Sequence, residues 1–252
     1  MLNHALAACE SLGTNWEVDL IGYQGSSLPD KILQEPRIHP RYISVSCVNA
    51  LRSLTRIPKC RFLFFTIYAL LRIIYQVIQL LYILWLSQSY DAILIQNPPC
   101  MPLLLVCVLT RLLRCGRTKL IIDWHNYGFS IMAVGGRPAA LVKIARWYEF
   151  WLGRFGDFHL TVSAAMRSDL EFEGIFRVAD DKARVVYDKA TPKFMLDMGR
   201  EEKLALFKKV GLDMSKNPVV MMSSTSYTPD EDFMELVLAL DECDTKAEVP
   251  PI

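Results

Sequence analysis

Short apolar runs alternate with amphipathic stretches along most of the chain. The runs that predict strands lie at residues 18–22, 42–45, 91–96, 119–123, 159–163, 183–187 and 218–222. Their Val, Ile and Leu content is typical of strands buried on both faces of a parallel sheet. The stretches that predict helices lie at residues 2–12, 102–114, 138–155, 164–170, 201–210 and 233–240. This alternation predicts an α/β fold with helices on both faces of a parallel sheet.

The order of the elements indicates one nearly complete domain and the start of another. A parallel α/β domain normally opens with a strand, whereas this chain opens with a helix, so we expect its first strand to be missing. The βα unit that starts near residue 216 cannot bury a core by itself. We therefore expect an N-terminal domain over residues 1–190, a linker with a helix over 191–215, and a truncated second domain over 216–252.

The longest apolar run, residues 62–86, predicts a long helix. It is long enough to cross a bilayer, but Arg72 lies near its middle, where a charge is costly. Arg72, Gln76 and Gln79 recur at helical spacing and share one stripe. We interpret the run as a helix whose apolar face lies in or on a membrane; the alternative is a helix buried in the domain core. The basic residues before it, which we expect at the lipid headgroups, are Arg52, Arg56, Lys59 and Arg61.

Composition excludes several classes of protein. The 252 residues carry a net charge of +1, which argues against a nucleic-acid binder held by phosphate contacts. The seven cysteines form no CxxC pair, so we expect no disulfide framework, no zinc site and a reducing compartment. The chain also lacks GxGxxG, Walker A, HExxH and GxSxG patterns, which argues against dinucleotide enzymes, P-loop enzymes, zinc proteases and serine hydrolases.

The strand at 119–123 ends in the cluster that is richest in chemistry. Asp123 and His125 are candidate proton-transfer groups, and Trp124 and Tyr127 offer flat apolar faces suited to a sugar ring. Carboxyl ends of strands are where α/β proteins place their ligands. The alternative is a strand terminus with a buried Trp and a hydrogen-bonded His. We expect residues 128–136, which contain glycine, to form a loop.

Two other strand ends are candidates. At 97–99 the sequence Asn-Pro-Pro is explained by a rigid stop after the strand. At 223–226 small hydroxyl residues stand between a strand and a helix start, where they suit either a phosphate site or a helix cap. The acidic residues at 230–232 fit a helix start and lack the spacing of a metal site.

Four segments together resemble one family, the chitobiosyldiphosphodolichol β-mannosyltransferases. They are residues 95–99 (Ile-Gln-Asn-Pro-Pro), 122–128 (Ile-Asp-Trp-His-Asn-Tyr-Gly), 186–189 (Val-Tyr-Asp-Lys) and 223–233 (Ser-Ser-Thr-Ser-Tyr-Thr-Pro-Asp-Glu-Asp-Phe), with a shorter match at 145–149 (Ala-Arg-Trp-Tyr-Glu). The resemblance runs from His4 to the helix after Phe233.

The resemblance implies a GT-B architecture, in which two Rossmann-like domains face a cleft. It implies transfer of the first mannose of the N-glycan precursor from GDP-mannose to dolichol-diphosphate-linked chitobiose, β-1,4 and with inversion. The reaction would take place on the cytosolic face of the endoplasmic reticulum membrane, with no metal or other cofactor. A complex with other transferases of the dolichol pathway is also implied.

Site residues follow from the resemblance by position. Inversion needs a base that takes the acceptor proton, and Asp123 and His125 both remain candidates. The residues expected to bind the acceptor are Asn97, Trp124, Asn126 and Tyr127. Those expected to bind the donor diphosphate are Ser223, Ser224, Thr225 and Ser226.

The chain also departs from the family. We expect the opening strand with its Gly-rich turn, and most of the second domain, to be missing, and we therefore expect this chain not to bind GDP-mannose tightly. The alternative function is that of a truncated, inactive, membrane-associated paralogue that binds a partner or lipid. Another GDP-sugar transferase of the same architecture remains a third interpretation.

Overall fold

The computed structural model describes residues 2–25, 27–44, 49, 61–99, 101–173, 181–188, 198–214, 220 and 233–245. The chain divides into two compact units, Met1–Tyr187 and Asp188–Ile252. In the second unit the described elements are the helices α9 (Arg200–Lys209) and α10 (Phe233–Thr245). The strand expected at 218–222 and the hydroxyl-rich segment after it lie outside the described residues.

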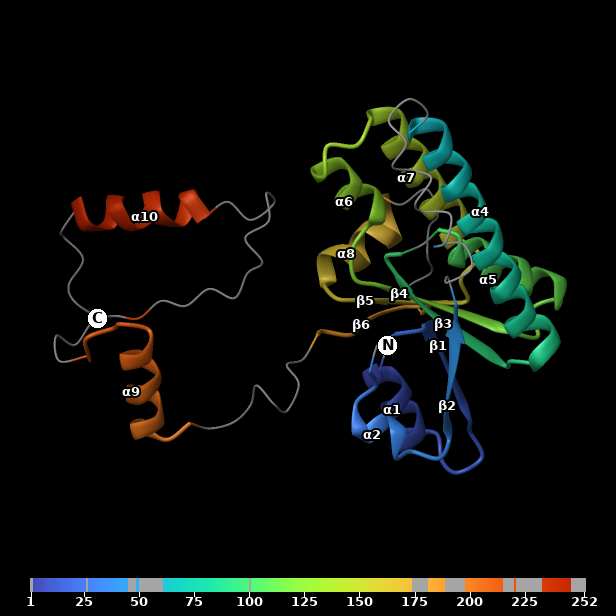
Figure 1. The fold of residues 1–252 in the computed structure, drawn as a ribbon, viewed down its shortest axis with the longest axis horizontal. Coiled ribbons are helices and arrows are strands. Elements are labelled where there is room, and N and C mark those ends of the chain that lie inside the picture. The colour runs from blue at the N-terminus through green and yellow to red at the C-terminus, as the bar shows by residue number, and fades with distance from the viewer. Residues whose placement is uncertain are drawn as a thin grey trace. The chain divides into compact units, whose positions relative to one another are not determined.

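The first unit alternates strands and helices, as predicted (Figure 1). Its strands are β1 (Val18–Tyr23), β2 (Ile38–Ile43), β3 (Ala92–Asn97), β4 (Lys119–Trp124), β5 (Phe158–Thr161) and β6 (Ala183–Val185). Its helices are α1 (Leu2–Ser11), α2 (Asp30–Leu33), α4 (Arg61–Leu81), α5 (Leu103–Leu113), α6 (Gly128–Val134), α7 (Ala139–Gly153) and α8 (Ala164–Ser168), with π-helical turns η3 (Tyr82–Ser87) and η4 (Asp169–Glu173).

All described strand pairs are parallel, which confirms the α/β prediction. They form two sheets rather than one: β1 pairs with β2, and β3, β4, β5 and β6 pair in that order. β2 begins earlier than expected and contains Pro40. The N–H of Val18 donates to the carbonyl of Arg37, and the alternation along a strand then places the missing N–H of Pro40 on the outer edge of β2, where proline is tolerated.

The core of the first unit lies against the four-stranded sheet. Leu120, Ile122 and Trp124 of β4 are fully buried, and they belong to one cluster with Leu104 of α5 and Phe150 of α7. β4 is central in the order and carries helices over it, so it reads as a nearly continuous apolar run. This burial fixes the strand whose end carries the candidate chemistry.

The loop predicted for residues 128–136 is wrong, because Gly128–Val134 forms helix α6. The carboxylate of Glu149, on α7, accepts hydrogen bonds from the backbone N–H groups of Gly128 and Phe129, both at 3.1 Å. Negative charge on these otherwise unpaired N–H groups stabilises a helix start. The glycine that suggested a loop is thus the first residue of a helix capped from another element.

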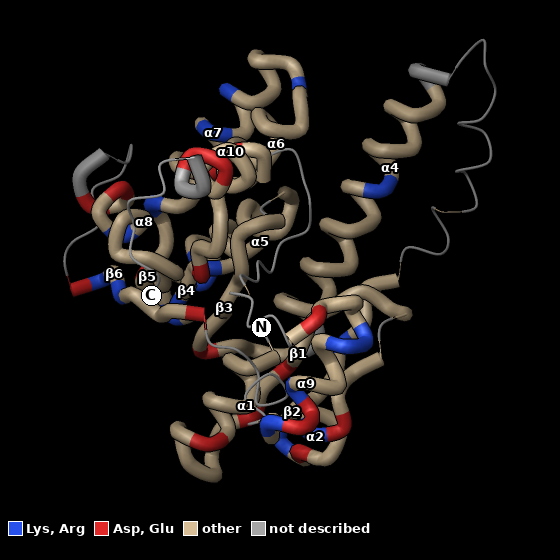
Figure 2. Tube along the Cα trace, turned by 90° about the vertical axis from the view of Figure 1, so that its left-hand side faces the viewer, with Lys and Arg blue, Asp and Glu red and all other residues tan. Residues whose placement is uncertain are grey.

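Helix α4 exposes most of its apolar surface, so the alternative of a buried core helix is wrong. Residues 64–86 are long and apolar enough to cross a membrane by length and composition, yet only 11% of the most apolar 18-residue stretch is buried. The side-chain amide of Gln79 pairs with both the N–H and the carbonyl of Ser44 (2.9 and 2.8 Å), and Gln76 donates to Tyr23. Gln76 and Gln79 therefore face the domain, whereas Arg72 is exposed. Figure 2 shows α4 largely without charge.

Candidate functional site

The candidate residues meet at the carboxyl edge of the four-stranded sheet. The parallel register pairs Gln96 with Asp123 and Asn97 with Trp124. Asn97 and Asp123 are buried, with exposed fractions of 1% and 2%. The sheet therefore brings together two motifs that the sequence analysis took separately, Asn97 and residues 123–127.

Asp123 holds two histidines on one oxygen. Its Oδ2 lies 2.9 Å from Nε2 of His125 and 3.0 Å from Nε2 of His4. The Asp123 side chain is 3% exposed, whereas those of His125 and His4 are 23% and 29% exposed. A buried carboxylate thus orients two imidazoles that reach the surface, an arrangement suited to proton transfer through a histidine.

His4 is a member of this cluster that the sequence analysis missed. It lies on α1 and meets Asp123 across 119 positions of sequence. The resemblance begins at His4, but the residue lies outside the segments that carry the resemblance, so only the folded contact identifies it as part of the site.

The same three side chains can hold a metal ion. One ligand atom from each of His4, Asp123 and His125 lies within 4.8 Å of the others. Two imidazoles and a carboxylate are ligands typical of zinc or ferrous iron. The sequence analysis expected no metal here, and this grouping arises because α1 supplies the second histidine.

Trp124 is a buried support beneath the cluster. Its exposed fraction is 0%, and its Nε1–H donates to Nδ1 of His159 at 3.0 Å, with the two rings stacked. Burial lowers the pKa of His159 to about 4, so that ring is neutral at physiological pH. The ring of Trp124 therefore offers no exposed face to a sugar in this structure and acts through its neighbours.

Tyr127 and Asn97 carry buried polar atoms that can meet a ligand. The Tyr127 hydroxyl and the Asn97 side-chain oxygen have no hydrogen-bond partner among the described residues. Burial raises the pKa of Tyr127, and the charges of Asp169 and Glu149 raise it further, so the phenol stays protonated. Buried polar groups without a partner are rare in folded proteins, which makes these two atoms candidates for ligand contact.

Glu149 organises the loop that carries the site, and the sequence analysis did not assign it a role. It is fully buried, binds the N–H groups that start α6, and lies 3.5 Å from Nδ2 of Asn97. Asn97 in turn bonds the backbone carbonyl of Asn126 (3.4 Å), whose own side chain is exposed. The signal available in the sequence was the charge of Glu149 on the apolar face of the helix that became α7.

The role of residues 223–226 in binding the donor diphosphate stays a prediction. Ser223, Ser224, Thr225 and Ser226 all lie outside the described residues.

Comparison with known proteins gives a consistent set of relatives. No family model matches the chain. It is 32% identical over 259 residues to the chitobiosyldiphosphodolichol beta-mannosyltransferase of Yarrowia lipolytica, which covers 100% of the chain and 52% of that protein. The proteins of the same name from Candida albicans and Mus musculus are 30% and 31% identical, covering 94% and 98% of the chain and 50% and 54% of each relative. The predicted resemblance is confirmed, and the chain spans about half the length of these relatives.

Proposed function

We propose that this chain, a homologue of the chitobiosyldiphosphodolichol beta-mannosyltransferases along nearly its whole length, forms the acceptor side of a mannosyltransferase. The reaction proposed is transfer of mannose from GDP-mannose to dolichol-diphosphate-linked chitobiose, forming a β-1,4 bond with inversion. The relatives' names support the acceptor and the sugar. The donor, the linkage and the stereochemistry are our extension.

The contact between Asp123 and His125 is the observation that carries this proposal. In an inverting transfer the acceptor oxygen attacks the sugar carbon while a base takes its proton, and the nucleoside diphosphate leaves from the opposite face. His125 is the better placed base, because its side chain is 23% exposed and that of Asp123 is 3% exposed. Asp123 then orients the imidazole and stabilises its protonated form.

The remaining acceptor residues take supporting or contacting roles. The Asn97 amide oxygen and the Tyr127 hydroxyl are buried and have no hydrogen-bond partner among the described residues. We therefore propose that a hydroxyl of the acceptor donates to the Asn97 oxygen and that another acceptor group bonds the Tyr127 hydroxyl. Asn126, which is exposed beside them, contacts the sugar from the rim, and Trp124 supports the strand end from below.

Substitution of the proposed base tests the mechanism. His125→Gln, made at the matching position of a complete relative, should lower kcat by about 100-fold or more while leaving GDP-mannose binding intact. Asp123→Asn should also lower kcat, because the imidazole loses its orienting charge. His39→Gln is a matched control, since the His39 side chain is 42% exposed and lies 3.8 Å from Glu17. Near-normal rates in both site variants would exclude this pair as the proton-transfer machinery.

Helix α4 is the proposed contact with the membrane that carries the lipid acceptor. Leu70 and Ile74 are 55% and 53% exposed, and Leu86 in η3 is 77% exposed. Because Gln76 and Gln79 are turned toward the domain, an apolar ridge is left for lipid. We propose that this ridge docks the protein on the cytosolic face of the endoplasmic reticulum membrane, where it can meet other transferases of the pathway.

Flotation with phospholipid vesicles tests the docking. Leu70→Glu combined with Ile74→Glu should reduce the bound fraction more than about tenfold, because burial of the two side chains is lost. Leu204→Glu on α9, where Leu204 is 43% exposed, is the control. Equal binding by all variants would place the lipid contact elsewhere.

The donor side rests on residues 223–226. We propose that their N–H and hydroxyl groups contact the diphosphate of GDP-mannose. Calorimetric titration of GDP-mannose into a complete relative tests it: alanine at the positions that match Ser223 and Ser224 should weaken binding. A chain that binds lipid vesicles but neither donor nor acceptor would instead favour the inactive, membrane-associated paralogue.

A further inference from the structure

The cluster of His4, Asp123 and His125 holds a buried carboxylate that has no permanent cation beside it. The Asp123 side chain is 3% exposed, and its ion-pair partners among the described residues are the two histidines, which are charged only when protonated. A buried charge is normally paired or bound to a metal ion. The proposed proton transfer uses Asp123 and His125, so the second histidine still needs a role.

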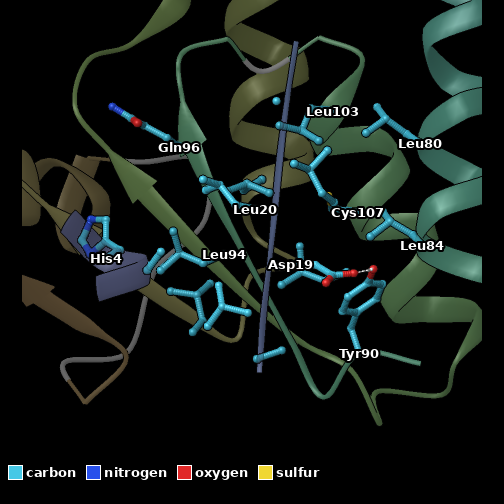
Figure 3. A pocket seen from close by; sticks show the side chains of 18 of the residues that line it. His4, Asp19, Leu20, Leu80, Leu84, Tyr90, Leu94, Gln96, Leu103 and Cys107 are labelled. Atoms are coloured by element: carbon cyan, nitrogen blue, oxygen red, sulfur yellow. Dashed lines mark hydrogen bonds between the residues drawn. The ribbon is translucent and has the colours of Figure 1, made fainter. Parts of the chain in front are cut away.

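Asp19, another buried carboxylate of the first unit, shows the usual arrangement. Its side chain is also 3% exposed, but its Oδ2 accepts hydrogen bonds from Nε of Arg41 at 3.2 Å and from the hydroxyl of Tyr90 at 2.6 Å. Figure 3 shows Asp19 and Tyr90 in an apolar groove of about 650 Å³, with His4 away from them. Asp123 therefore differs from Asp19 in the kind of partner and not in burial.

The ligand atoms of the cluster lie close to the geometry of a tetrahedral metal site. An ion about 2.0 Å from nitrogen and oxygen ligands places neighbouring ligands about 3.3 Å apart in a tetrahedron. Oδ2 of Asp123 lies 2.9 Å from Nε2 of His125 and 3.0 Å from Nε2 of His4. One ligand atom from each residue lies within 4.8 Å of the others. An ion can therefore replace both hydrogen bonds after shifts of a few tenths of an ångström along them.

The fold anchors both parts of the cluster and leaves it open to solvent. The backbone N–H of His125 donates to the carbonyl of Asn97 at 3.0 Å, and Ala5 and Cys9 hold α1 in a small apolar core. The side chains of His4 and His125 are 29% and 23% exposed. An ion can enter from solvent, and water can supply its fourth ligand.

We propose that His4, Asp123 and His125 bind Zn²⁺ or a similar transition-metal ion, and that the bound ion blocks the proposed base. Two imidazoles and one carboxylate suit such ions, whereas Mg²⁺ prefers oxygen ligands. Metal binding follows from the contacts alone, and only its effect on transfer rests on the proposed function.

Metal binding and proton transfer need different tautomers of His125. A neutral imidazole carries one N–H. While Nε2 of His125 donates to Asp123, the lone pair of Nδ1 is free to take the proton of the acceptor hydroxyl. When Nε2 binds Zn²⁺ instead, the single proton moves to Nδ1, and no lone pair is left to act as a base. The ion also occupies the oxygen of Asp123 that would stabilise a protonated imidazole.

Titration of the chain with Co²⁺, a coloured substitute for Zn²⁺, tests the site. We expect one equivalent of Co²⁺ to give the visible absorption of a four-coordinate ion, and Zn²⁺ but not Mg²⁺ to displace it. Cys115 is exposed and thiolates also bind such ions, so the near-ultraviolet band of a cobalt–thiolate bond should be missing. Such a band would place the metal on cysteine and overturn the site.

Substitution of the ligands assigns the metal to the cluster. His4→Gln and His125→Gln should each weaken Co²⁺ binding by about 100-fold or more, since the loss of an outer partner of a metal ligand already costs about 10–100-fold. His39→Gln is the matched control, because the His39 side chain is 42% exposed and lies 3.8 Å from Glu17. Binding by His4→Gln as tight as that of the control would overturn the site.

A measurement on the unaltered chain makes the test independent of how the variants fold. Diethyl pyrocarbonate modifies the free nitrogen of a neutral imidazole, and mass spectrometry locates the modified residue. Zn²⁺ should slow the modification of His4 and His125 and leave that of His39 unchanged. Equal modification of all three with and without Zn²⁺ would contradict the proposal.

Mannose transfer by a complete relative that has the same three residues at the matching positions tests the block. Its rate should fall by about 100-fold or more when Zn²⁺ saturates the site and recover when a chelator removes the ion. Full activity with Zn²⁺ bound, or activity that requires Zn²⁺, would overturn the block. Inactivity both with Zn²⁺ and with chelator would instead refute the proposed transfer, while the cobalt titration decides the metal site by itself.

Discussion

Acidification should destabilise the first unit through His159. Burial lowers the pKa of this histidine from 6.5 to about 4, so it stays neutral in the folded chain while its unfolded counterpart takes up a proton. The unfolded state therefore binds more protons between pH 6.5 and 4, and stability must fall as the pH drops through that window. Well above pH 6.5 the histidine is neutral in both states, and the effect is absent.

The size of this loss follows from the two pKa values. A pH of 5 lies about 1.5 units below the pKa of the unfolded histidine. In the folded chain the same histidine is still mostly neutral at that pH. Each unit is worth about 1.36 kcal/mol, so the free energy of unfolding should fall by about 2 kcal/mol between pH 7 and pH 5. That is a large part of the stability of a typical domain.

Chemical denaturation at the two pH values measures this difference. His159→Gln is the matched variant, because a glutamine oxygen can still accept the hydrogen bond from Trp124 without titrating. The other histidines are the same in both proteins, so their contributions cancel in the comparison. If the variant lost as much stability between pH 7 and pH 5 as the parent chain, the neutral buried histidine would not be the cause.

Three further predictions concern the stability of the first unit. Glu149→Gln should destabilise the first unit by about 2 kcal/mol, because the N–H groups at the start of α6 lose a charged acceptor; denaturation, with circular dichroism for helix content, checks it. Gly156→Ala should cost about 1–3 kcal/mol, since a Cβ there would lie 2.8 Å from the ring of His159, and unchanged stability would contradict that packing. Arg111→Lys should lower the melting temperature, because Arg111 binds both carboxylate oxygens of Asp157, at 2.7 and 2.9 Å, a pairing that lysine cannot reproduce; an unchanged melting temperature would show that the pair adds little.

The sequence predicts the strands well and their partners poorly. The apolar runs at β3 and β4 gave their bounds to within a residue, because buried parallel strands have a continuous pattern. The predicted strand at 42–45 begins later in the sequence than β2, which starts at Ile38. Pro40 normally breaks a strand, and it is tolerated here only because the edge that lacks its N–H faces outward. Helix α6 was missed because its cap, Glu149, lies 21 positions away.

The site shows the same limit at the level of single side chains. Asp123 and His125 are neighbours in sequence, and the strand end alone singles them out. His4 has no such signal, since its contact with Asp123 spans 119 positions. Local patterns identify residues that share a strand end, whereas residues brought by a packed helix appear only after folding.

Helix α1 links an apolar groove, which lies between β1 and β3, to the candidate site. Its residues His4 and Ala5 line the groove, and His4 also holds the oxygen of Asp123 that binds His125. A shift of α1 by one helical turn, about 5.4 Å, would break a contact of 3.0 Å and leave Asp123 with His125 as its sole described histidine partner. The position of α1 and the geometry of the proton-transfer cluster are therefore coupled.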